Sequence, residues 1–336
     1  MTTLRTEHEP LTPAAPRQLS RRSVGADKVF VVGSRAIGAT VLAITGGIGA
    51  FLAWQAWPTL SRYGTTFFTE TQWQPEADTL GIASVLVGTA TVATVAILIA
   101  FPLALATALY ISEYAPVRIK GLLVSMVDLM AAVPSIIYGM WGFFLIQPAA
   151  SGIARWLHTY VGWIPIFQVD TDPTAAQWEQ TRYTASAFIA GIAVAMMVLP
   201  MASAVMREVF SQAPLGEREG ALALGATRWG MIRSVVLPFG RGGIIGGTML
   251  GLGRALGETI AVLLIISPAF DLKFRPLEIG TETVSALIAG RFGEASAAQL
   301  SALLTAGLVL FLITLGINTL AAIVVSRSRS GAGTDI

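Results

Sequence analysis

The chain has 336 residues, of which 54% are hydrophobic and only 12% are charged. This balance lies outside the usual range of a water-soluble globular domain and is typical of a membrane protein. Because there is no cysteine and there are only two histidines, the sequence excludes a disulfide framework and a thiolate metal site, and we expect no metal. The formal net charge of +2 gives no support to a nucleic-acid partner.

Six segments are long and apolar enough to cross a bilayer as helices, once an ionisable residue is allowed in several of them. We therefore expect an all-α membrane protein with six transmembrane helices. Residues 1–28 form a polar tail, residues 29–326 hold the spans, and residues 327–336 form a second tail. The predicted spans are Val29–Trp54, Gly81–Ile111, Leu122–Ile146, Ala185–Met206, Gly242–Ser267 and Leu300–Val325.

Basic residues outside these spans are distributed unequally. The two tails and the segments 112–121 and 207–241 contain 14 Lys and Arg, whereas the alternate set of loops contains 6. Because basic residues accumulate on the cytoplasmic side, both termini and the long loop at residues 207–241 are predicted to be cytoplasmic. The apolar run after the first tail is too long for the core of a signal peptide, so we interpret it as an uncleaved first span.

The predicted third span contains Pro134, which lacks a backbone N–H and bends or breaks a helix. Ser135 and Tyr138 follow it, so hydroxyl groups gather at the bend, and we assign both to the lining of a transport pathway. Asp128 lies about six residues inside the same span, on the face of Ser135, and is expected to be buried. Three roles stay open for it: partner of an arginine, proton site, or structural acceptor at the inner water boundary.

The predicted fifth span carries an arginine near the middle of the bilayer. Arg254 is about 12 residues into the span, which at 1.5 Å per residue is ~18 Å from the inner end. A charge at that depth costs at least ~2.5 kcal/mol unless it faces protein or a pathway. Glu258 follows four residues later on the same helical face, and Thr259 adds a hydroxyl. We expect an Arg254–Glu258 ion pair in which an oxyanion competes for the guanidinium, with a purely structural pair as the alternative.

The same span is rich in glycine. Gly243, Gly247 and Gly251 recur at four-residue spacing, with Gly253 and Gly257 in a second register. Small residues at this spacing allow membrane helices to approach closely. The pattern therefore predicts tight packing of this helix against its neighbours.

The loop before the fifth span has the pattern of a short surface helix. Acids stand at its beginning, good helix formers follow, and Gly225 can end it in the left-handed conformation, which predicts a helix over Glu217–Leu224. Such a helix fits a groove on another protein or, alternatively, lies on the lipid interface. Its apolar side consists of Ala221, Leu222 and Leu224, and the side expected to face water consists of Glu217, Arg218 and Glu219.

The run Glu219-Gly220-Ala221, followed by Gly225 and by Val235-Val236-Leu237-Pro238, resembles the EAA loop of ABC importer permeases. It departs from the usual motif at Gly220 and Val235. The chain contains no G-x-x-x-x-G-K-[ST] loop, so we expect no cofactor here and ATP-Mg on separate subunits. The resemblance implies the MetI-like fold of these permeases and assigns coupling to the ATPase to Glu217, Glu219, Gly220, Ala221, Leu224, Gly225 and Pro238.

Three further stretches, Glu113–Pro116, Asp128–Gly142 and Gly253–Val262, look like signature sequences of phosphate permeases of the PstC type. The similarity extends over about residues 29–325. It implies import of inorganic phosphate across the cytoplasmic membrane of a prokaryote. The expected partners are a second, homologous permease, two ATP-binding subunits and an extracytoplasmic phosphate-binding protein. The expected substrate pathway consists of Arg254, Glu258, Thr259, Ser135, Tyr138 and Asp128.

Two other functions stay open from the sequence alone. A permease for another oxyanion, such as sulfate or molybdate, would differ in which anion stimulates ATPase activity. A secondary anion transporter or channel would use Asp128 or Glu258 as a proton site, but no inverted repeat is visible. An enzyme is not expected, because no nucleophile, metal or paired-carboxylate constellation is present. Trp73 and the segment Thr171–Thr184 are the positions where we expect contact with the binding protein.

Overall fold

The computed structural model describes residues 25–169 and 181–327. The chain falls into two compact units, residues 1–50 and 51–336. Most of the two predicted tails, and most of the segment Thr171–Thr184, lie outside the described residues. The described part of the first unit is the beginning of helix α1 (Ala26–Tyr63), a continuous helix that contains the predicted first span.

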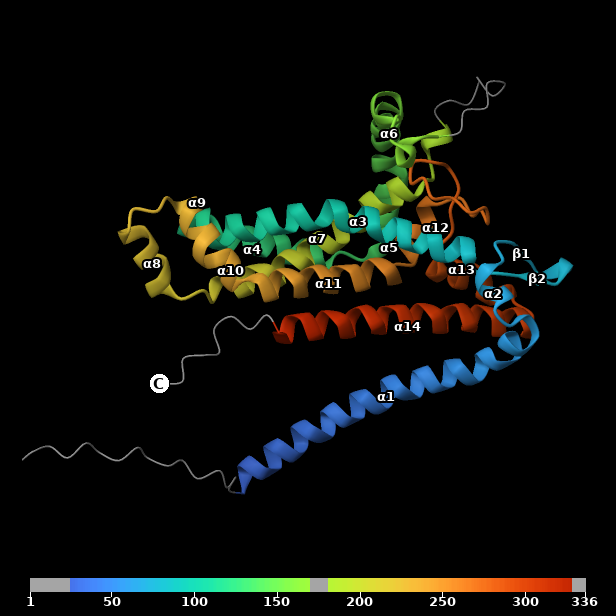
Figure 1. Cartoon of the computed structure of the whole chain (residues 1–336), viewed down its shortest axis with the longest axis horizontal. Coiled ribbons are helices and arrows are strands. Elements are labelled where there is room, and N and C mark those ends of the chain that lie inside the picture. The colour runs from blue at the N-terminus through green and yellow to red at the C-terminus, as the bar shows by residue number, and fades with distance from the viewer. Residues whose placement is uncertain (1–24, 170–180, 328–336) are drawn as a thin grey trace, which may run out of the picture. The chain divides into compact units, whose positions relative to one another are not determined.

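The second unit is built from helices and one short hairpin. Several of its helices run along a common direction (Figure 1): α3 (Ala83–Leu109), α4 (Val117–Ala132), α7 (Ala187–Ser211), α11 (Arg241–Gly257) and α14 (Ala297–Arg327). The hairpin pairs β1 (Trp73–Gln74) with β2 (Thr79–Leu80) in antiparallel register, with Trp73 opposite Leu80. Shorter helices are α2 (Thr66–Thr69) and α13 (Val284–Arg291).

The composition of these helices confirms an all-α membrane protein. Five described helices are long and apolar enough to cross a membrane: Asp27–Tyr63, Ala83–Tyr114, Ser135–Val161, Ala187–Ser211 and Ala297–Ser326. A sixth candidate span is a bent pair, Arg228–Phe239 and Arg241–Gly257, whose two parts meet at 68°. The count of five or six agrees with the prediction, although the chain breaks within the third and the fifth predicted spans.

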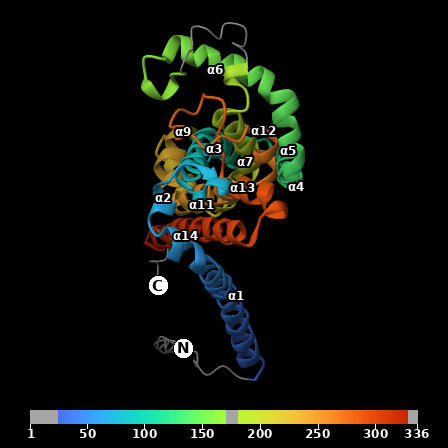
Figure 2. The same cartoon turned by 90° about the vertical axis from the view of Figure 1, so that its right-hand side faces the viewer.

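The third predicted span, Leu122–Ile146, is wrong in its bounds. The chain leaves the helical conformation at Val133, after α4, and restarts as α5 (Ser135–Trp141). A π-helical turn then joins α5 to α6 (Gln147–Val161). Helix α6 runs crosswise to α3 and α7 (Figures 1 and 2). Pro134 explains the break, because it has no N–H to donate and disfavours helical backbone at the residue before it.

The core of the second unit lies where α7 packs against α3 and α11. Small side chains let these helices approach closely. Three glycines of α11 lie directly against α7. A Cβ atom on Gly243, Gly247 or Gly251 would lie within 3 Å of an α7 atom, which belongs to Val209, Ala202 and Val198 respectively. The tight packing predicted for the glycine-rich helix is therefore confirmed. The small residues are Gly243, Gly247 and Gly251 on α11 and Ala96, Ala100, Ala104 and Ala108 on α3.

A second cluster forms near the hairpin. Trp73 is buried there with Leu80, Ile82 and Leu303. The Ser301 hydroxyl donates to the carbonyl oxygen of Gln55 at 2.7 Å, which ties the end of α1 to the beginning of α14. The burial of the Trp73 ring contradicts the expectation that it contacts a binding protein.

Candidate functional site

Two helix breaks meet in the second unit. One separates α4 from α5 at Pro134, and the other separates α11 from α12 (Ile260–Ile265). The helices that follow the two breaks, α5 and α12, touch at Gly139, where a Cβ would lie 2.8 Å from the Cα of Ala261. A break inside a membrane frees backbone groups that must find partners in protein or in a water-filled cavity. In secondary transporters such broken helices form the substrate site. The paired breaks are therefore the candidate functional site.

Tyr138 holds the first break in place. Its hydroxyl donates to the carbonyl oxygen of Met130 at 2.8 Å, which satisfies a backbone acceptor in the last turns of α4. Its ring is buried against Met197 and Ala261. The hydroxyl predicted to donate to a substrate thus already has an acceptor, and Tyr138 offers a passing ligand only its lone pairs. Ser135 stands half-buried in the first turn of α5.

The second break separates Arg254 from Glu258. Helix α11 ends at Gly257, and Glu258 has extended backbone with φ −67° and ψ 130°. The predicted ion pair on one helical face is therefore wrong, and the described residues contain no ion pair between these two side chains. Glu258 is buried, and its carboxylate instead accepts a hydrogen bond from the N–H of Ala261 at 3.3 Å. The Thr259 hydroxyl donates to the carbonyl oxygen of Gly257 at 3.1 Å.

The charges at the second break match the helix dipoles. Arg254 lies in the last turn of α11, where a cation is favoured, and Glu258 caps the first turn of α12, where an anion is favoured. Arg254 is exposed on the surface of this chain and lies within electrostatic range of Tyr138. Within the described residues its guanidinium has no ion-pair partner. The break therefore presents a cation to whatever occupies the adjoining space.

Asp128 is not the buried acid that the sequence predicts. More than half of its side chain, 56%, is exposed, and its carboxylate pairs with Arg207 of α7 at 3.7 Å. Of the three roles left open, the pair with an arginine is the one observed. The contact joins α4 to the last turns of α7. Across the described ranges, no group of three or more His, Asp or Glu side chains is placed to hold a metal ion.

The predicted surface helix is present as α8 (Leu215–Ala223), and Gly225 follows it with a φ of 86°. Leu224 is 91% exposed and Leu215 is 71% exposed, so this chain alone leaves an apolar surface uncovered. After α8 come α9 (Arg228–Met231), a π-helical turn and α10 (Leu237–Phe239). Of the residues assigned to coupling, Glu217, Glu219, Gly220, Leu224 and Gly225 are exposed, and Ala221 and Pro238 are half-buried.

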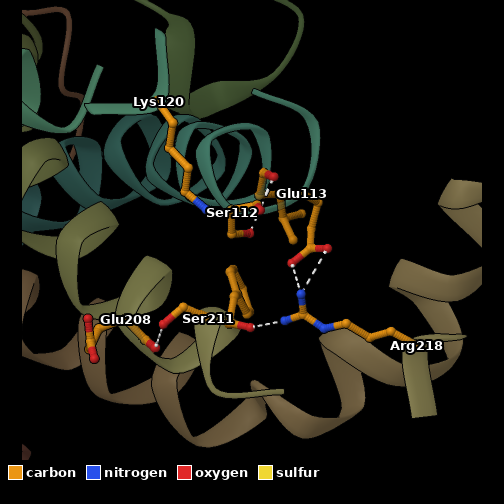
Figure 3. A network of polar contacts seen from close by, with 8 residues as sticks. Ser112, Glu113, Lys120, Glu208, Ser211 and Arg218 are labelled. Atoms are coloured by element: carbon orange, nitrogen blue, oxygen red, sulfur yellow. Dashed lines mark hydrogen bonds and ion pairs between the residues drawn. The ribbon is translucent and has the colours of Figure 1, made fainter. Parts of the chain in front are cut away.

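One residue of α8 does not face water as predicted. Arg218 is only 15% exposed, because its guanidinium pairs with Glu113 at 3.3 Å and donates to the carbonyl oxygen of Phe210 (Figure 3). Glu113 lies in the π-helical turn Tyr110–Tyr114 that ends α3. The two partners are 105 positions apart, and no local pattern pairs them. The one sign of this pair in the sequence is the position of Glu113, an acid at the end of an apolar span.

Comparisons with known proteins agree with this architecture. Residues 100–330 match the family described as binding-protein-dependent transport system inner membrane component. The chain belongs to this family. A phosphate transport system permease protein PstC 2 of Mycobacterium bovis is 37% identical over 328 residues, covering 96% of this chain and 99% of that protein. A PstC protein of Xylella fastidiosa is 36% identical over 319 residues, covering 95% and 96%.

Solved structures show the same fold. A bacterial ABC transporter involved in the import of the polysaccharide alginate aligns with a TM-score of 0.53 at 17% identity, covering 90% of this chain and 98% of that one. A bacterial alginate ABC transporter in complex with a pentasaccharide-bound periplasmic protein aligns with a TM-score of 0.54 at 16% identity, covering 90% and 97%. The chain is thus a multi-pass membrane permease of the ABC importer fold, as its EAA-like loop predicts.

Proposed function

We propose that this chain is a permease subunit that conducts inorganic phosphate through an ABC importer. The observation that carries the proposal is the pair of helix breaks that presents Arg254, in a chain similar over nearly its whole length to permeases named for phosphate transport. A guanidinium is a planar fork of donors that matches the oxygens of phosphate. Arg254 is exposed on this chain, and its charge acts strongly once a second permease covers it and lowers the effective dielectric constant around it.

The other predicted pathway residues take distinct parts in this proposal. Glu258 fixes the start of α12 and so sets the position of Arg254 relative to the break. Ser135 supplies a hydroxyl group on one side of the crossing, and the Thr259 hydroxyl on the other side reaches the anion by giving up its hydrogen bond to the carbonyl oxygen of Gly257. Tyr138 stabilises the first break, and the ion pair of Asp128 holds α4 against α7. Because one arginine does not balance a phosphate dianion, further donors come from a second, homologous permease that faces Arg254.

Energy for transport comes from two ATP-binding subunits, which hold ATP-Mg, and this chain supplies no catalytic residue. Helix α8 docks with its exposed leucines in a groove on one of these subunits. An extracytoplasmic phosphate-binding protein delivers the anion to the outer loops. In this arrangement both termini are cytoplasmic and the complex lies in the cytoplasmic membrane of a prokaryote.

Phosphate uptake by the complete complex in proteoliposomes tests the proposal. We expect Arg254→Ala to abolish ATP-driven uptake while the complex still assembles. Arg62→Ala is the matched control, because Arg62 is an exposed arginine paired with Asp78 near the hairpin, and its removal should leave uptake unchanged. Normal uptake by a fully assembled Arg254→Ala complex would refute the site.

Two further measurements separate the alternatives. Sulfate and molybdate also fit a guanidinium fork, so each is tested for stimulation of ATPase activity in place of phosphate. A response to one of them and none to phosphate would reassign the substrate. Ion-gradient-driven uptake by this chain without an ATPase would indicate a secondary transporter.

A further inference from the structure

We infer that the ion pair between Glu113 and Arg218 is the link that transmits movement of α8 to α3 and α7, so that Arg218 couples ATP hydrolysis to transport. The inference rests on the proposed function, because it takes α8 as the helix that contacts the ATP-binding subunit. It adds a positioning residue, Arg218, and its partner to the residues assigned to coupling from the sequence.

One guanidinium joins three helices. The Nη1 atom of Arg218, on α8, lies 3.3 Å from Oε1 and 3.4 Å from Oε2 of Glu113, at the end of α3. Its Nη2 atom donates to the carbonyl oxygen of Phe210, in the last turn of α7. Figure 3 shows the Arg218 side chain reaching between the two helix ends to make both contacts. A displacement of α8 therefore acts directly on the inner ends of α3 and α7.

The end of α7 is in turn wedged into the core. The Phe210 ring is fully buried, and it lies so close to Gly240 that a Cβ there would be 2.3 Å from the ring. Gly240 directly precedes α11, the helix that carries Arg254. A pull on the Phe210 carbonyl is thus applied next to the start of α11, at the opposite end from the second helix break.

Stability alone does not explain this pair. Glu113 is 4% exposed, and the cost of removing two charges from water often exceeds their attraction, so a well-packed apolar pair is commonly as stable. In the described part of the chain, Arg218 Nε and Glu113 Oε1 are buried without a hydrogen-bond partner. The arrangement is better suited to holding helix ends at a fixed geometry than to lowering the energy of the fold.

A second contact supports the same link. The Arg228 guanidinium, in the first turn of α9, lies 5.5 Å from the centre of the Tyr114 ring. Tyr114 adjoins Glu113 in the π-helical turn, and such turns are frequent at functional sites. Helix α8 itself buries none of its residues. Its apolar contact with the bundle is small, with Ala221 packed half-buried against the core, so its position depends largely on these tethers.

The test measures phosphate transported per ATP hydrolysed by the complete complex in proteoliposomes. We expect Glu113→Gln and Arg218→Gln each to lower this ratio by about 5-fold or more, the lower range of coupling between sites. ATP-binding subunits should still co-purify. Glu208→Gln is the matched control. It replaces an exposed carboxylate at the same end of α7 that accepts a hydrogen bond from the Gln212 side chain, and it should leave the ratio unchanged.

The double variant distinguishes a link from two independent effects. If both residues act through one pair, Glu113→Gln with Arg218→Gln lowers the ratio no further than the stronger single change. It also leaves no uncompensated buried charge, so assembly is preserved even if a single variant assembles poorly. An unchanged ratio in the assembled double variant would overturn the inference. Absence of ATP-driven phosphate uptake by the wild-type complex would instead refute the proposed function.

Discussion

The crossing of α5 and α12 predicts a strong effect of one added methyl group. Gly139 is buried at this crossing, and a Cβ there would lie 2.8 Å from the Cα of Ala261 and 2.9 Å from Cδ1 of Leu264. The first neighbour is backbone and cannot rotate away. Gly139→Ala should therefore push the two broken helices apart.

The size of the effect follows from these distances. Ordinary contact begins near 3.4 Å, so the helices must separate by about 0.6 Å at this point. Overpacking of this kind costs about 1 to 3 kcal/mol, and the gain in helix propensity from glycine to alanine offsets up to about 1 kcal/mol. We expect the free energy of unfolding to fall by roughly 1 to 2 kcal/mol. Because the shift moves Pro134 relative to Glu258, uptake should fall by about an order of magnitude or more.

Thermal unfolding of the solubilised chain and phosphate uptake by the complete complex measure the two effects. Gly121→Ala is the matched control, because Gly121 lies in α4 with no atom near its missing side chain. That change should be neutral or stabilising by up to about 1 kcal/mol. If Gly139→Ala behaves like Gly121→Ala in both assays, the tight crossing does not position the breaks and the reasoning is wrong.

Three further predictions concern other parts of the chain. Leu224→Asp should lower co-purification of the ATP-binding subunit by about tenfold, as expected for a contact residue at an interface. The stability of this chain should not change, because Leu224 is 91% exposed. Gly225→Val should destabilise the end of α8 by about 1 to 2 kcal/mol, whereas Gly225→Asn should cost less, because φ is 86° there; thermal unfolding of both variants checks this. Burial raises the pKa of Glu282, before α13, from 4.5 to about 7, so the folded chain holds this proton more tightly than the unfolded chain does. The free energy of unfolding should fall by about 3 kcal/mol as the pH rises from below 4.5 to above 7. Glu282→Gln should remove that dependence, which unfolding of the variant and of the wild type at pH 5 and pH 8 checks.

Local chemistry was enough to predict several elements. The acids before Leu224 and the glycine after it indicate a short helix over Glu217–Leu224, and α8 covers Leu215–Ala223 with Gly225 in the left-handed conformation. The four-residue spacing of Gly243, Gly247 and Gly251 predicts a close helix contact, and α7 provides it. Such features depend on neighbouring residues, so the sequence carries them directly.

Helix continuity was harder to predict. The apolar run Gly242–Ser267 contains no proline to signal a break near Glu258. Helical periodicity therefore placed Arg254 and Glu258 on one face. The chain nevertheless leaves the helix after Gly257, and Glu258 caps α12 instead. At the other break Pro134 was a visible signal, but the crosswise direction of α6 was not. Whether a helix ends in the middle of an apolar run depends on which neighbours satisfy the freed backbone groups.

By itself, the sequence determined that this is a helical membrane permease with an EAA-like loop, because hydropathy, charge bias and motif spacing are local properties. Only the tertiary structure decided that Arg254 stands apart from Glu258, that Asp128 pairs with Arg207, and that Arg218 reaches Glu113. Each of these facts depends on side chains that meet across separate helices. Their pairing is set by the packing of α3, α7 and α11, which the order of residues along one helix does not reveal.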